Sequence, residues 1–338
     1  MSREPSMFDV AKLAGVSHQT VSRVLRGHPN VRESTRSKVR TAIAELGYRP
    51  NSAARALVIG RDQVLGVVAP RSTLFGPVSQ LAALEEHAAT AGFAVSVARV
   101  HELDVASIAG AVNQHLARRV AGLVIIAPVA AVSSALEGLP SDIPVVAIDA
   151  DPTRPEAMVT VDQAAGARLA TRHLLERGHS TVWHVAGPPD WFDAAARRSG
   201  WERELREAGA EVPPILQADW SPASGFRAGE ILARIPEATA IFAANDSLAL
   251  GILRALSEHG RRIPEDVAVV GFDDIPEAAF MIPPLTTIRQ DFQQVGQTAV
   301  EQVLAQLRGE EPHRPTRIPP EIVVRASSGA GTPFDSMP

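Results

Sequence analysis

Residues 8–27 read Phe8-Asp-Val-Ala-Lys-Leu-Ala-Gly-Val-Ser-His-Gln-Thr-Val-Ser-Arg-Val-Leu-Arg-Gly27, which is the pattern of two short helices joined by a tight turn. Ser6 is placed to cap the first helix, and Asp9 stands three residues later to complete the cap. Gly15 lies where the chain must reverse, a conformation that glycine adopts at low cost. Ser17 is placed to cap the second helix. The stretch therefore predicts a helix-turn-helix.

The two predicted helices each have an apolar side and a polar side. Val10 and Leu13 form the apolar side of the first helix, and Val21, Val24 and Leu25 that of the second. A second helix with amide, imidazole and guanidinium groups on its open side suits the major groove of DNA. An ordinary helical hairpin with a solvated polar face is the alternative. The open side of the second helix carries His18, Gln19, Ser22, Arg23 and Arg26.

The sequence after this stretch also favours DNA binding. Residues 33–46 predict a third helix that ends at Gly47, a residue typical of helix C-termini. Polar residues near its start suit phosphate contacts, which fix the position of a protein on DNA without reading its sequence. These residues are Arg32, Thr35, Arg36 and Lys38.

Residues 51–57 are too short and too polar to form a stable helix alone. They could become helical when packed against a second copy on DNA, with Leu57 as a wedge in the minor groove. A plain interdomain linker is an equally good interpretation from these residues alone.

Charge is distributed unevenly along the 338 residues. Residues 1–61 hold 11 Lys and Arg against 4 Asp and Glu, a net charge of +7, whereas residues 62–338 hold 22 against 34, a net charge of −12. A basic N-terminal part on an acidic body is typical of a protein whose N-terminal part meets phosphates. No secretory signal or spanning apolar segment is visible, so a cytoplasmic protein with no membrane contact is expected.

From residue 63 onward, apolar strand-like runs alternate with amphipathic helical stretches. The runs at 64–69, 93–97, 121–126 and 144–148 are followed by a second cycle after residue 161. This alternation predicts an α/β fold with two doubly wound parallel sheets. A ligand cleft is expected between them, at the carboxyl ends of the strands.

Polar residues follow several of these strands. Asp149, Asn245 and Asp273 come directly after apolar runs, and Asp246 and Asp274 adjoin them. Carboxylates accept hydrogen bonds from hydroxyls, and amides donate to them, so the set suits a polyhydroxylated ligand. Taken singly, each residue could instead be a helix cap or turn residue, Asp246 above all.

Motifs for metal, nucleotide or nucleophilic chemistry do not occur in the sequence. There is no cysteine, no His-Glu-x-x-His, no P-loop lysine motif and no nucleophile elbow. The histidines do not pair at the spacing of metal ligands. We therefore expect no enzyme activity, no metal site and no cofactor.

The chain resembles the LacI/GalR family of bacterial transcription regulators over nearly its whole length. The motifs that carry the resemblance are Val10–Arg23, Ala186–Pro188, Ala244–Gly251, Val270–Asp274 and Pro283–Phe292. The resemblance implies a helix-turn-helix headpiece on a two-lobed body like that of periplasmic binding proteins. It also implies a dimer on a pseudo-palindromic operator and a galactoside-like sugar effector.

The resemblance also assigns site residues. For DNA it implies half-sites read by His18, Gln19 and Arg23, with Leu57 as a wedge at the operator centre. The full set of expected DNA-contacting residues is Ser17, His18, Gln19, Thr20, Ser22, Arg23, Arg26, Thr35, Asn51 and Leu57. For the sugar it implies Leu74, Asp149, Arg197, Asn245, Asp273, Gln290 and Phe292, with Trp220 as the aromatic platform under the ring. Residues 327–338 lack leucine heptads, so a dimer rather than a tetramer is expected.

The expected domains are the headpiece at 1–48, a hinge at 49–61, an N-terminal lobe at 62–161 plus 291–320, a C-terminal lobe at 162–290 plus 321–330, and a tail at 331–338. Crossovers between the lobes are expected near 161–162, 290–291 and 318–320.

A repressor that a sugar releases from its operator is the predicted function. The alternatives are a solute-binding sugar transport protein and a purine- or nucleotide-responsive corepressor-type regulator. An enzyme of the periplasmic-binding fold is a more distant one.

Overall fold

The computed structural model describes residues 5–25, 30–48, 63–126, 128–129, 143–150, 158–311 and 315–329. It divides into two compact units, residues 1–62 and 63–338. The first contains the expected headpiece together with the expected hinge, and from here on we call the first unit the headpiece and the second the body. Several predicted features lie outside the described residues: Arg26, Asn51, Leu57, the hinge at 49–61 and the tail at 331–338.

The described part of the headpiece contains α1 (Met7–Ala14), α2 (His18–Leu25) and α3 (Glu33–Leu46). The three helices pack around one apolar core, which contains Val10, Ala11, Ala14, Val21, Val24, Val39, Ala42 and Tyr48. Leu13, predicted to face this core, is exposed instead. The reason is the helical period: Ala11 and Ala14 already occupy the face that Val10 begins.

The predicted ends of the headpiece helices are confirmed. Ser6 and Asp9 form a reciprocal capping box at the start of α1, and Gly15 follows its end with a φ of 64°. The Ser17 hydroxyl accepts the backbone N–H of Thr20 at 3.2 Å and so caps α2. These caps satisfy N–H groups that a helix leaves without partners.

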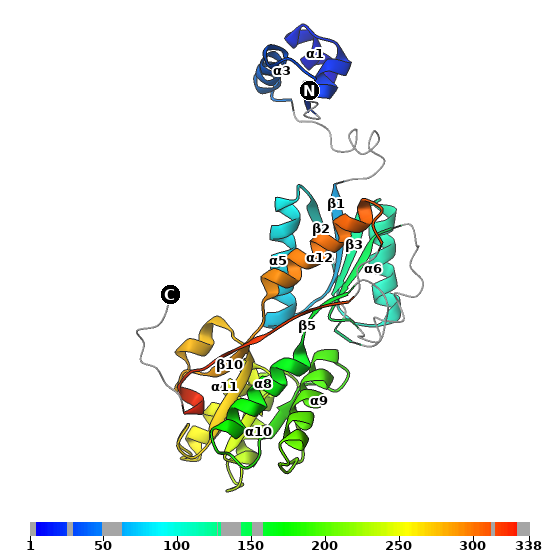
Figure 1. Cartoon of the computed structure of the whole chain (residues 1–338). Helices are drawn as coiled ribbons and strands as arrows, with labels where there is room; N and C mark the ends of the chain where they lie inside the picture. Colours follow the sequence, from blue (N-terminus) through cyan, green and yellow to red (C-terminus); the bar gives the residue numbers. More distant parts are fainter. Residues whose placement is uncertain are drawn as a thin grey trace. The chain divides into compact units, whose positions relative to one another are not determined.

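The first sheet of the body has the strand order β11-β5-β4-β3-β1-β2, and all of its pairs are parallel. Helices α5 (Phe75–Thr90) and α12 (Phe292–Leu307) cover one face, and α6 (Val105–Ala117) covers the other (Figure 1). The strands are β1 (Val64–Pro70), β2 (Ala94–Val100), β3 (Gly122–Ile126), β4 (Val145–Ile148), β5 (Met158–Val161) and β11 (Thr316–Ile318).

The second sheet has the order β12-β10-β9-β8-β6-β7 and is parallel except for β12, which pairs antiparallel with β10. Helices α10 (Pro222–Leu232) and α11 (Asp246–Glu258) cover one face, and α8 (Gln163–Glu176) and α9 (Phe192–Glu207) cover the other. The strands are β6 (Trp183–Ala186), β7 (Leu216–Gln217), β8 (Ala240–Ala243), β9 (Ala268–Asp273), β10 (Thr286–Arg289) and β12 (Glu321–Val323), and the short helices are η1 (Pro276–Phe280) and η2 (Ala326–Ser328).

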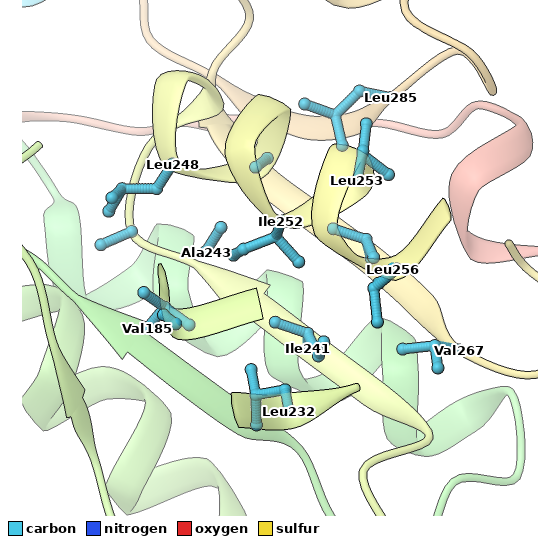
Figure 2. Packing of buried hydrophobic residues seen from close by; sticks show 14 of the residues in the cluster. Val185, Leu232, Ile241, Ala243, Leu248, Ile252, Leu253, Leu256, Val267 and Leu285 are labelled. Carbon is cyan, nitrogen blue, oxygen red and sulfur yellow. The ribbon is translucent and has the colours of Figure 1, made fainter. Parts of the chain in front are cut away.

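Figure 2 shows one of the two apolar layers that cover the second sheet. Ile241 and Ala243 of β8 point toward Ile252 and Leu256 of α11. Phe242, between them in sequence, packs in the other layer with α8 and α9. A strand buried on both sides has no polar face to expose, so its sequence is a continuous apolar run.

Among the elements that the structure describes, the chain passes between the two sheets three times, from β5 to α8, from β10 to α12 and from β11 to β12. These are the segments in which the sequence predicted the crossovers. The first two end in helix caps, because the Asp162 carboxylate accepts the Ala165 N–H and the Asp291 carboxylate accepts the Gln294 N–H. The start of each following helix is therefore fixed at the crossover.

Candidate functional site

The outer side of α2 presents polar groups. Ser17, His18, Gln19 and Arg23 are exposed, whereas Thr20, Ser22 and Thr35 are half-buried. The His18 ring stacks on the exposed Phe8 ring, with centroids 4.8 Å apart and planes 17° from parallel. This contact holds the imidazole against α1. The surface suits hydrogen bonding to base edges.

The body contains a pocket lined by residues of both sheets and of the helices that cover them. All eight residues that the resemblance implied for the sugar line this one pocket: Leu74, Asp149, Arg197, Trp220, Asn245, Asp273, Gln290 and Phe292. Their sequence separation, from 74 to 292, shows that only the folded body brings them together.

Three pocket residues have left-handed backbone, in which side chains other than glycine are rare. The φ values are 54° at Asp149, 72° at Trp220 and 113° at Asp273. Asp149 follows β4, Trp220 lies two residues before α10, and Asp273 is the last residue of β9. Such conformations cost about 1–3 kcal/mol each and collect at functional sites. Their gathering at one pocket supports a binding role for it.

Arg197, on α9, is buried in this pocket and tied at two of its three nitrogens. Its Nε donates to the Gln163 side-chain oxygen at 2.9 Å, and its Nη1 donates to the Ala244 carbonyl at 2.5 Å. Its Nη2 lies 3.6 Å from an Asp273 oxygen. The third nitrogen therefore remains for carboxylates or a ligand.

A chain of side-chain amides connects Arg197 to Asp273. Gln163 donates to the Gln290 side-chain oxygen at 2.8 Å, and Gln290 donates to Asp273 at 2.7 Å. Gln163 is the first residue after the β5–α8 crossover, and Gln290 lies in the β10–α12 crossover. The pocket is thus bonded directly to two of the three crossovers.

Burial raises the pKa of two predicted carboxyl groups. The Asp149 carboxylate accepts hydrogen bonds from Thr160, at 2.8 Å, and from Gln80, and these bonds and Arg197 only partly offset the effect of burial. Burial likewise raises the pKa of Asp273 to about 6, against the lowering effects of Arg197 and Gln290. Burial therefore makes both carboxyl groups costly to ionise.

Trp220 and Asn245 are linked at the base of the pocket. The Asn245 side chain donates to the Trp220 carbonyl at 3.2 Å, and its oxygen accepts the Leu248 N–H at 2.7 Å. Asn245, not Asp246, therefore caps α11, contrary to one sequence expectation. Trp220 meets Trp191 edge to face, with centroids 5.8 Å apart, and Arg197 lies 5.6 Å from its ring centroid.

The other two strand-end carboxylates bond within the protein. Asp246 accepts the Thr287 hydroxyl at 2.6 Å and the Ile275 N–H at 2.9 Å, and burial raises its pKa well above the ordinary value. Asp274 pairs with Arg289 at 2.6 Å and with Arg325 at 2.7 Å. These two residues hold the lobe together rather than line the pocket.

Sequence reasoning missed seven residues of the lining. Asp193 carried a usable signal, because it precedes Arg197 by four residues on the same helix face. Gln80, Trp191 and the others reach the pocket only through tertiary packing. The missed residues are Gly76, Pro77, Gln80, Ile126, Pro128, Trp191 and Asp193.

Within the described ranges, no group of three or more His, Asp or Glu could hold a metal ion. Two histidines are buried core residues. His115 contacts the Val67 carbonyl, and His184 contacts the Phe242 carbonyl, while burial lowers the pKa of His184 to about 4. None of the helices in the described parts of the chain is long and apolar enough to cross a membrane.

Comparison with known proteins agrees with this architecture. Residues 6–51 match the model for bacterial regulatory proteins of the lacI family, and residues 171–328 match a periplasmic binding protein-like domain. The lactose operon repressor of Escherichia coli K12 is 36% identical over 329 residues, covering 96% of this chain and 90% of that protein. The chain belongs to the lacI family.

Other relatives and solved structures also match over nearly the whole length of both chains. The transcriptional repressor PurR of Haemophilus influenzae is 31% identical over 94% of this chain and 97% of its own length. The solved structure of the lac repressor dimer bound to operator and the anti-inducer ONPF matches with a TM-score of 0.89 at 34% identity, over 97% of this chain and all of that one. The regulator CelR in complex with cellobiose matches at 0.71 and 28% identity, over 96% and 99% of the two chains. The predicted family, fold and regulatory class are thereby confirmed.

Proposed function

We propose that this lacI-family regulator is a repressor that binds a pseudo-palindromic operator as a homodimer and leaves it when a galactoside-like sugar enters the body pocket. The observation that carries the proposal is the convergence of eight residues, predicted from the resemblance, on one pocket. Because the operator is part of the bacterial chromosome, the proposed regulator acts in the cytoplasm.

The headpiece supplies the DNA contacts. His18, Gln19 and Arg23 read base edges from α2, whereas Ser17, Thr20, Ser22 and Thr35 contact phosphate and sugar groups. Arg26, Asn51 and Leu57 complete the set from segments outside the described residues. Because phosphate contacts supply much of the affinity, operator binding falls steeply with salt.

The pocket suits a sugar because it combines an aromatic face with fixed polar groups. Trp220 stacks on the apolar face of a pyranose ring. Arg197 and Asn245 donate to hydroxyl oxygens, and Asp149 and Asp273 accept from hydroxyl hydrogens. Leu74 and Phe292 close the apolar side, and Gln290 adds an amide.

The hydrogen-bonded chain from Arg197 through Gln163 and Gln290 to Asp273 couples sugar binding to the arrangement of the two lobes. A ligand that binds Arg197 and Asp273 changes the bonding of residues that sit in two crossovers. The crossovers then act as pivots, and one arrangement of the lobes becomes favoured. Coupling of this kind is reciprocal, so the operator weakens sugar binding by the same factor.

Exposed apolar residues on the C-terminal lobe are the proposed dimer contact. Phe280 and Ile282 are 69% and 93% exposed at the end of η1, and Leu250 of α11 is exposed as well. Neighbouring exposed apolar side chains such as Phe280 and Ile282 suit an interaction site on a soluble protein. We assign this patch to contact with a second copy of the chain.

Fluorescence anisotropy on an operator selected from random DNA tests the proposal. A galactoside releases the operator from the wild-type chain, whereas Arg197→Ala keeps the operator and fails to respond. Gln19→Ala weakens specific binding by about tenfold to a hundredfold, whereas Thr41→Ala, an exposed change on α3, leaves it intact. Purine bases are assayed alongside, because a regulator related to PurR could use one as a corepressor. The galactoside assignment is refuted if a purine tightens operator binding and no sugar releases the operator.

A further inference from the structure

The pocket holds a third carboxylate, Asp193, beside Asp149 and Asp273. One Asp193 oxygen lies 3.8 Å from Nη2 of Arg197, the same nitrogen that lies 3.6 Å from Asp273. Arg197 is the only Lys, Arg or His among the described residues that line the pocket. One guanidinium therefore faces three carboxyl groups, and the lining carries a surplus of negative charge.

Arg197 does not satisfy Asp193. Its Nε and Nη1 are bonded to Gln163 and to the Ala244 carbonyl, and the contact from Nη2 to Asp193 is longer than a hydrogen bond. No hydrogen-bond donor reaches the Asp193 carboxylate from the part of the chain that the structure describes. Burial and the neighbouring Asp149 and Asp273 raise its pKa well above the ordinary value, against the lowering effect of Arg197.

Two further polar atoms of the lining have no hydrogen-bond partner among the described residues. They are Oε1 of Gln80 and Nε1 of Trp220, and both side chains are more than nine-tenths buried. Buried polar atoms without partners are costly, so such atoms point to a ligand that supplies the bonds. Gln80 offers an acceptor and Trp220 a donor. The ligand must therefore bring hydrogen-bond donors to the acidic side and an oxygen to the indole.

The two tryptophans add a further property. Trp191 and Trp220 meet edge to face, and both line the same pocket as Asp193. Indole faces attract cations within about 6 Å. An ammonium group is a compact cation with three donors and no acceptor, which matches a site made of a carboxylate, an amide oxygen and indole faces.

We propose that the natural effector is an amino sugar whose protonated amine binds at Asp193, while its hydroxyls take the positions proposed for a neutral galactoside. This inference rests on the proposed function, since it names the chemical class of the sugar in the same pocket. A cation at Asp193 offsets the cost of ionising three carboxyl groups around one guanidinium.

Asp193 also has a purely structural explanation. It lies in the first turn of α9, where a carboxylate interacts favourably with the helix dipole. That role requires no ligand and predicts no preference for an amine. The two explanations therefore differ in the ratio of the affinities for charged and neutral sugars.

Isothermal titration calorimetry of the full chain measures that ratio. The probes are methyl β-galactoside, its derivatives with an amine in place of the hydroxyl at C2, C3, C4 or C6, and the N-acetyl form of each as an uncharged control. We expect one amine to bind at least tenfold more tightly than both methyl β-galactoside and its own N-acetyl form. In Asp193→Asn this ratio falls toward one.

Asp190→Asn is the matched control, because Asp190 is exposed, lies three residues away and is absent from the pocket lining. It removes the same charge and leaves the ratio unchanged. Circular dichroism and thermal melting establish that both variants are folded. If the neutral galactoside binds as tightly as every amine, the amine assignment is wrong and the galactoside proposal stands. If neither neutral nor aminated galactosides bind, both proposals are wrong.

Discussion

The guanidinium carbon of Arg197 lies 3.8 Å from the centroid of the Phe272 ring. The apolar core of the C-terminal lobe therefore supports one face of the only cation in the described pocket lining. This stacking fixes the plane of the guanidinium, because Nε and Nη1 are also bonded to the protein. The side chain is thus held in place before any ligand arrives.

Arg197→Ala is expected to lower the free energy of unfolding of the body by about 3–5 kcal/mol at pH 7. The loss arises because Asp149, Asp193 and Asp273 then lack their shared cation. It is smaller at pH 5, since burial raises the pKa of all three carboxyl groups and protonation removes the repulsion. Urea denaturation at both pH values measures the difference. Arg198→Ala, an exposed change one residue along, should alter stability by about 0.5 kcal/mol or less.

The raised pKa of Asp273 predicts a pH-dependent stability. Its pKa is about 6 in the folded protein and near 3.8 when exposed, so the folded state holds this proton more tightly. The contribution of protonated Asp273 to the free energy of unfolding is fully present below about pH 4, and it is lost as the pH rises through 6. Asp273→Asn cannot ionise. Its stability relative to wild type should therefore increase by about 3 kcal/mol between pH 4 and pH 8.

Asp266→Asn provides a control of opposite sign. The hydrogen bonds from Arg262 lower the pKa of Asp266, so its ionised form stabilises the folded state. That contribution is present above the ordinary pKa and disappears only in strong acid. Between pH 4 and pH 8 the difference between Asp266→Asn and wild type should stay flat. A flat profile for Asp273→Asn as well would show that Asp273 is not buried from water.

Local sequence signals predicted the ends of the headpiece helices because the residues concerned act on their own backbone. Ser6 and Ser17 accept N–H groups within three residues, and Gly15 and Gly47 adopt left-handed turns. The same local reasoning failed at α11, where Asn245 rather than Asp246 is the cap. Asp246 is held instead by Thr287 and Ile275, from distant parts of the chain.

Fewer of the pocket residues than of the headpiece helix ends could be predicted from local sequence alone. Asp149, Asn245 and Asp273 follow strands, and parallel strands bring such residues to one edge. Arg197 and Trp220 required the family resemblance, because nothing local marks them as facing a ligand. Gln80 and Trp191 were missed by both routes, since only the packing of the two lobes places them in the lining.

The close contact between α10 and α11 predicts that replacing glycine by alanine has opposite effects on stability at Gly251 and at Gly110. A Cβ at Gly251 of α11 would overlap the carbonyl oxygen of Pro222 and the backbone of Phe226, whereas a Cβ at Gly110 of α6 would meet nothing within 4 Å. Gly251→Ala should therefore destabilise the body by about 1–3 kcal/mol or more. Gly110→Ala should stabilise it by about 0.5–1 kcal/mol, because alanine is the better helix former. Urea denaturation compares them, and equal effects would contradict this account of the α10–α11 contact.

The proposed dimer depends on the apolar residues at the end of η1. Ile282→Asp places a charge where we assign contact with a second copy, so the variant should sediment as a monomer at micromolar concentration. Its operator affinity should fall as well, because the two headpieces are no longer linked and lose the advantage of effective concentration. Ile231→Asp is the matched control: Ile231 is 55% exposed on α10, apart from the Phe280–Ile282 segment. Sedimentation velocity separates the outcomes. A dimer that survives Ile282→Asp but dissociates in Ile231→Asp would move the interface to α10.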